Sequence, residues 1–166
     1  MIGPPDDGYI RFDRFEDVVA SVELVARLAP LPDDNSSRCK WTIVAAHSAL
    51  QGAMVCALFD PASYLERVSK KAARQAAKLG LPPDWIVEDR LVKFSILLER
   101  CIAGNPFCDP LVLTSEQHKN INELNSELRN NFLHFAPSGW SIQKTILPSI
   151  ICAALDLQAK SFISFQ

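Results

Sequence analysis

The sequence lacks several features that would point to a specialised protein. No apolar run approaches the roughly 18 residues of a membrane helix, so no membrane-spanning segment is expected. The first seven residues include neither a basic nor an apolar segment, so a secretory signal is not expected either. Internal repeats and low-complexity segments are also missing. The composition, 48% hydrophobic and 22% charged, is that of an ordinary globular protein. We expect a single cytoplasmic domain over residues 1–166, with a loose N-terminal arm at 1–11.

Neither sign of charge dominates, and cysteine and histidine are sparse. Seventeen basic residues against nineteen acidic ones give a net charge of −2. No global field therefore attracts nucleic acid, and any such role needs a local patch. The five cysteines are odd in number and no two have CxxC spacing, while Cys56 and Cys152 fall in apolar helical stretches. We expect reduced thiols in the core, with no metal site and no cofactor.

Hydrophobic periodicity predicts an all-α bundle of five to six helices. Sustained alternation of apolar and polar residues, which would indicate strands, is not found. The predicted helices cover residues 12–29, 38–59, 64–79, 85–102, 114–135 and 142–165. The second is apolar almost all round and should be the central helix. Gly80 is expected to end the third helix, Thr114 and Gln117 match a capping box, and Pro148 kinks the last helix or marks its true start.

The helix predicted over 114–135 has an unusual polar face. At about 100° per residue, one apolar stripe faces the core. Its members are Ile121, Leu124, Leu128, Phe132 and Phe135. Arg129 and His134 lie roughly 110° to either side of this stripe, Asn130 lies on the back face, and Leu133 projects outward between Arg129 and Asn130. An exposed leucine inside a polar arc indicates that a partner covers it.

The segment Arg129-Asn130-Asn131-Phe132-Leu133-His134 resembles the motif of the HEPN family of small α-helical domains. That motif is an arginine, four to six residues and a histidine, usually with a polar residue directly after the arginine. The motif itself covers only six residues, and the all-α layout extends the resemblance loosely over residues 12–165. The resemblance implies a metal-independent endoribonuclease of toxin or defence type. Its catalytic residues would be Arg129, Asn130 and His134.

These side chains suit RNA cleavage. A histidine ordinarily titrates near pH 6.5, so it can exchange a proton with the 2′-hydroxyl or the leaving 5′-oxygen. An arginine binds phosphate at two points, and an asparagine can orient the phosphate. On one helix, Arg129 and His134 point about 140° apart. The resemblance implies that two copies pack so that both motifs line one cleft: a homodimer with Leu133 in its interface, an RNA substrate and an inhibitory antitoxin-type protein partner.

Other interpretations of this segment stay open. His134 could merely interact with the dipole at a helix C-terminus, and Arg129 could be a surface residue bonded to Glu123 or Asn125. The alternative function is a non-catalytic dimerisation or protein-binding module on the same scaffold. A buried His134 would favour that module, whereas an accessible His134 would favour the enzyme. A DNA-binding helix-turn-helix protein fits poorly, because no basic recognition helix adjoins a tight turn.

Three further groups of residues carry weaker signals. A basic stretch in the third predicted helix is a weak candidate for binding the RNA backbone, with a solvated helix face as the alternative. It comprises Arg67, Lys70, Lys71, Arg74 and Lys78. His47, on the central helix one turn before Gln51, should be buried and hydrogen-bonded, and His118 should be exposed. The three tryptophans are expected to serve packing.

Overall fold

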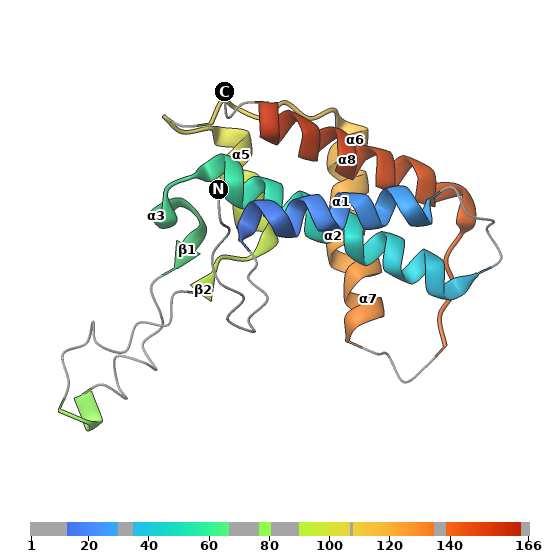
Figure 1. Cartoon of the computed structure of the whole chain (residues 1–166), viewed down its shortest axis with the longest axis horizontal. Helices are drawn as coiled ribbons and strands as arrows, with labels where there is room; N and C mark the ends of the chain where they lie inside the picture. Colours follow the sequence, from blue (N-terminus) through green and yellow to red (C-terminus); the bar gives the residue numbers. More distant parts are fainter. Residues whose placement is uncertain are drawn as a thin grey trace, which may run out of the picture.

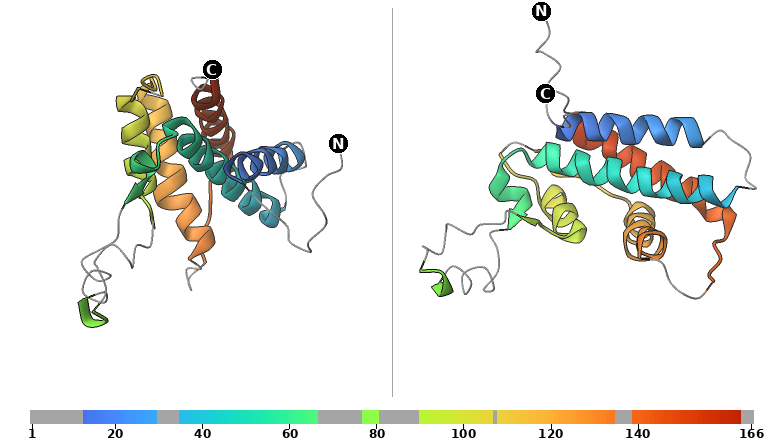
Figure 2. Two further views of the ribbon diagram at one scale, coloured as in Figure 1. Left: turned by 60° about the vertical axis from the view of Figure 1, so that its left-hand side comes forward. Right: turned by 60° about the horizontal axis from the view of Figure 1, so that its bottom comes forward.

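The protein is an all-α helical bundle, as the periodicity predicts. The computed structural model describes residues 13–29, 35–66, 77–80, 90–106, 108–134 and 139–163. The predicted N-terminal arm therefore lies outside the described residues. Three long helices, α1 (Arg14–Leu28), α2 (Ser36–Leu58) and α8 (Leu147–Ile163), extend side by side, and the remaining helices run across them (Figures 1 and 2). This crossing brings α5 and the α6–α7 segment onto α2.

The first two helices begin at side-chain caps. Asp13 accepts hydrogen bonds from the backbone N–H groups of Phe15 and Glu16, and Glu16 completes a capping box. Asn35 caps α2 through Ser37 and Arg38. These bonds satisfy N–H groups that have no partner within the helix. The predicted ranges 12–29 and 38–59 are confirmed to within about two residues.

The predicted helices at 64–79 and 85–102 need correction at their starts. Asp60 caps α3 (Pro61–Tyr64), with Pro61 in its first turn. The chain then becomes extended, and β1 (Leu65–Glu66) pairs antiparallel with β2 (Arg90–Leu91). Pairing supplies backbone hydrogen bonds in place of the helical ones, including Val92 N–H to the Tyr64 carbonyl at 2.9 Å. Consequently α5 (Phe94–Ala103) begins later than the predicted start at residue 85.

The predictions for residues 64–80 and 85–102 can be checked only where these residues are described. Residues 77–78 are helical, and Gly80 has a positive φ of 66°, as expected of a glycine that ends a helix. The remainder of the predicted helix, residues 67–76, lies outside the described part. The same holds for 85–89, the beginning of the next predicted helix.

The helix predicted over 114–135 forms with one irregularity. The Thr114–Gln117 capping box is present, with both hydrogen bonds at 3.1 Å. The helix runs as α6 (Ser115–Glu123), then as a π-helical turn, η1 (Leu124–Leu128), and ends as α7 (Arg129–Leu133). In the π-turn the Arg129 N–H bonds to the carbonyl of Leu124, five residues earlier. Such a turn changes the direction in which the following side chains project.

The last helix starts later than predicted. Residues 144–146 form a short 3₁₀ turn, η2 (Lys144–Ile146), and α8 begins at Leu147. Pro148 therefore lies in the first turn of α8 and marks its true start, one of the two outcomes predicted for it.

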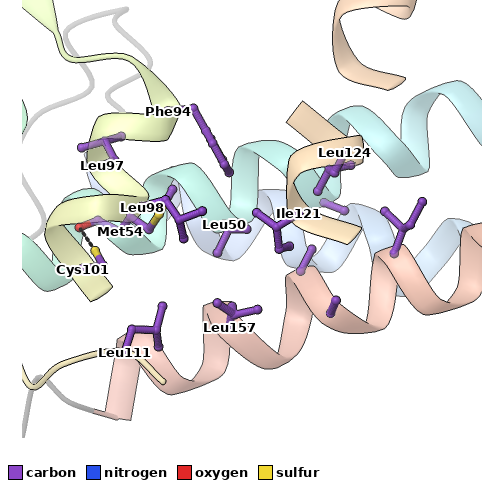
Figure 3. Close-up of a cluster of buried hydrophobic side chains, with 14 of the residues drawn as sticks. Leu50, Met54, Phe94, Leu97, Leu98, Cys101, Leu111, Ile121, Leu124 and Leu157 are labelled. Carbon is purple, nitrogen blue, oxygen red and sulfur yellow. Dashed lines mark hydrogen bonds between the residues drawn. The ribbon is translucent and has the colours of Figure 1, made fainter. Parts of the chain in front are cut away.

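The core is built around α2, as its apolar sequence predicts. Leu50 and Met54 of this helix are fully buried, and side chains from α5, α6, η1 and α8 lie around them (Figure 3). The partners in Figure 3 include Phe94, Leu97, Leu98, Cys101, Leu111, Ile121, Leu124 and Leu157. The Cys101 thiol contacts the Met54 carbonyl at 3.9 Å. The core thus holds α5, α6 and α8 against one central helix.

By length and composition alone, α2 could cross a membrane. Its mean hydropathy reaches 1.4, but 67% of the stretch concerned is buried by other parts of the protein. A core helix has the same properties, so this is weak evidence for a membrane span.

None of the five cysteines forms a disulfide bond, and their burial follows the expectation only in part. Cys56, Cys101 and Cys108 are buried and Cys39 is half-buried, whereas Cys152 is exposed. Cys152 occupies an apolar helix but faces away from the core, so its assignment as a core thiol is wrong.

Candidate functional site

Arg129 and Asn130 are joined in the structure. Both begin α7 and both are half-buried, so they are less exposed than the helical wheel predicted. Nη1 of Arg129 donates a 2.9 Å hydrogen bond to Oδ1 of Asn130, and Nδ2 of Asn130 donates at 3.1 Å to the carbonyl of Ser126. This chain of bonds fixes the guanidinium relative to the helix axis. The alternative bond from Arg129 to Glu123 or Asn125 is not formed.

One side-chain nitrogen of Arg129 lacks a hydrogen-bond acceptor among the described residues. This atom, Nε, is buried. A buried donor without an acceptor costs about 1–3 kcal/mol. A rearrangement that brought an acceptor oxygen to this group would therefore be favourable.

The other half of the motif is exposed. Leu133 ends α7 with 45% of its surface accessible, and His134 follows as the exposed C-terminal cap. The backbone N–H of His134 bonds to the Asn130 carbonyl at 2.9 Å. In the described part of the chain, no side-chain bond links His134 to Arg129 or Asn130. The structure therefore brings Arg129 and Asn130 together and leaves His134 apart at the end of the helix.

The π-turn connects this segment to a buried histidine that the sequence did not link to it. His47 of α2 is only 4% exposed, and its Nε2 donates to Oδ1 of Asn125 at 3.2 Å. Its ring stacks on Phe94, with 4.7 Å between centroids and an interplanar angle of 28°. Gln51, the neighbour expected from helical spacing, is not the partner.

The surroundings of His47 keep it neutral. Burial is the main cause and lowers its pKa from 6.5 to about 4, although the hydrogen bond to Asn125 acts in the opposite direction. The positive charge of Arg129 contributes a further lowering of this pKa, so the guanidinium lies near the imidazole. His47 is thus a neutral donor that holds the π-turn immediately before Arg129.

The remaining candidates have mixed outcomes. Of the basic stretch, Lys78 is described and exposed, and Arg67, Lys70, Lys71 and Arg74 lie outside the described residues. His118 is exposed, as predicted, and its Nδ1 accepts a bond from Asn122 at 3.1 Å. Trp140 packs edge-on against Phe132 at 4.7 Å. Trp41 is 47% exposed, with Lys40 over its ring, so only about half of its surface is packed. Trp85 lies outside the described residues.

No cluster of three or more metal-ligating side chains occurs within the ranges that the structure describes. Comparisons with protein-family models, with curated proteins and with solved structures found no match to this chain. Its function is therefore inferred from the residues and geometry described above.

Proposed function

We propose that the protein is a HEPN-like, metal-independent endoribonuclease of toxin or defence type. It acts as a homodimer in which Arg129, Asn130 and His134 of two copies line one cleft. The observation that carries this proposal is the end of α7, where a guanidinium, an amide and an exposed imidazole occur within six residues. The motif's resemblance supplies the reaction, and the geometry supports the assignment of roles.

In this proposal the three side chains divide the chemistry of phosphodiester cleavage. Arg129 neutralises the scissile phosphate as negative charge develops on it, and Asn130 keeps the guanidinium in place through its 2.9 Å bond. His134 moves the proton between the 2′-hydroxyl, the leaving oxygen and solvent. The exposure of His134 supports this role, because a proton-transferring group must reach the substrate.

A second copy is needed because the groups of one chain do not converge. Arg129 is half-buried near His47, whereas His134 is exposed beyond the last turn of α7. Packing two α7 ends around a two-fold axis would set Arg129 of one copy opposite His134 of the other. Leu133, 45% exposed between them in sequence, would supply the apolar contact.

The alternative is a non-catalytic dimerisation or protein-binding module. The exposed Leu133 favours this alternative equally, because it needs a covering partner whether or not RNA is cleaved. The two functions differ in whether His134 carries out chemistry.

The test is cleavage of total RNA in the presence of excess chelator by the parent and two single variants. His134→Ala removes the proposed proton carrier, and His118→Ala is the matched control, an exposed histidine of α6. We expect cleavage by the parent and His118→Ala, and at least a hundredfold loss in His134→Ala, which is the usual size of a general acid–base contribution. Equal cleavage by all three proteins would exclude His134 as a catalytic residue. No cleavage by a verified dimer would favour the binding module.

A further inference from the structure

A large cavity lies next to the α7 segment and has no part in the proposed function. It occupies about 600 Å³ between the N-terminal half of α2, the end of α7 and the start of α8. Its walls are mainly apolar side chains from these elements and from residues 140–142. They include Ile43, Phe132, Trp140, Ile142, Leu147 and Ile151. The volume lies within the range of roughly 300–1,000 Å³ that small-molecule sites have.

Within the described residues, the charged side chains that line the cavity are both positive. The half-buried Arg38 and the exposed Lys144 both line it, from the first turn of α2 and from η2. Among the described lining residues there is no carboxylate. An apolar interior with two cations at its boundary complements a molecule that has an apolar body and a negative head group.

We propose that this cavity binds a medium-chain alkyl carboxylate. The alkyl chain packs against Phe132, Trp140 and the aliphatic walls, and the carboxylate lies near Arg38 and Lys144. Burial of methylene groups supplies the affinity, and the two cations supply the preference for an anion. This proposal does not depend on ribonuclease activity, because binding is measured directly.

Calorimetric titration with octanoate, decanoate and decanol tests both parts of the proposal. Each buried methylene should strengthen binding about fourfold, so decanoate should bind about 15 times more tightly than octanoate. Decanol, which has the chain without the charge, should bind at least tenfold more weakly than decanoate. Absence of saturable decanoate binding, or equal binding of decanol, would overturn the proposal.

Two charge-reversal variants locate the head group. Lys144→Glu should weaken decanoate binding at least tenfold while leaving decanol binding within twofold of the parent. Lys119→Glu, an exposed lysine of α6 that does not line the cavity, is the matched control and should not change either affinity. A loss of decanoate binding equal in both variants would show a general charge effect and would contradict a site near Lys144.

Two cysteines in the lining allow the position of the bound alkyl chain to be tested. Cys39 and Cys152 line the cavity, and Cys152 is exposed. Decanoate at saturation should slow alkylation of Cys152 at least fivefold, measured by peptide mass spectrometry. Cys56 and Cys101 are internal controls, because burial raises the pKa of their thiols to about 11 and about 12 and keeps them unreactive. Unchanged alkylation of Cys152 under saturating decanoate would place the ligand elsewhere and overturn the assignment.

Discussion

His47 should make the protein sensitive to mild acid. The imidazole is 4% exposed, and burial lowers its pKa from 6.5 to about 4. In the unfolded chain the same group takes up a proton near pH 6.5. As the pH falls below about 6.5, the unfolded state therefore binds a proton that the folded state does not bind. The free energy of unfolding decreases as a result. The loss continues until the pH reaches the folded-state pKa.

The size of this effect follows from the two pKa values. Each pH unit between them is worth about 1.4 kcal/mol, so lowering the pH from about 7.5 to about 4.5 should remove about 2 to 3 kcal/mol through His47 alone. His47→Gln isolates this contribution, because glutamine does not titrate in this range and its amide N–H can still bond to Asn125. The free energy of unfolding is measured in urea at several pH values for both proteins.

The parent should become less stable relative to His47→Gln by about 2 to 3 kcal/mol over this pH range. Carboxylates titrate at the low end of the range, but they do so in both proteins and cancel in the difference. A histidine ring signal of His47 that titrates near pH 6.5 in the folded protein would refute the reasoning. A pH-independent difference between the two proteins would refute it as well.

Three further predictions concern stability, each measured by urea unfolding against the parent. Leu50→Ala should cost about 2–5 kcal/mol, because it removes a fully buried side chain at the centre of the core, and a cost under 1 kcal/mol would contradict that position. Thr114→Ala should cost about 1 kcal/mol by breaking the capping box, and no change would mean that the box contributes nothing in solution. Gly104→Ala should cost more than Gly80→Ala. Both glycines have positive φ, but only a Cβ at Gly104 would lie 2.9 Å from Pro110, so equal costs would contradict this crowding.

Sequence periodicity was sufficient to predict the helical class and the central helix. The apolar residues of α2 recur on all sides, which is typical of a buried helix, and Leu50 and Met54 are fully buried. The cap at Thr114 was also predictable, because it depends on local hydrogen bonds between neighbouring residues. Local signals thus predicted the helices at 12–29, 38–59 and 114–135 to within about two residues.

The features that the sequence did not predict depend on contacts between distant residues. Leu65 becomes extended because it pairs with Leu91, and no local pattern specifies a pairing across that separation. The π-turn at 124–128 is coupled to the bond between His47 and Asn125, which joins two helices far apart in the chain. A helical wheel assumes uniform turns, so it placed Arg129 too far outward. The exposed Leu133 was predicted correctly.

The proposed composite site predicts complementation between two inactive variants. Arg129→Ala and His134→Ala proteins are each expected to lack RNA cleavage. After they are unfolded together and refolded, half of the dimers should be mixed, and each mixed dimer keeps one intact pair of Arg129 and His134. Cleavage in chelator should then return to about a quarter of the parent rate. No recovery in a sample with mixed dimers verified by mass spectrometry would contradict a site shared between two copies.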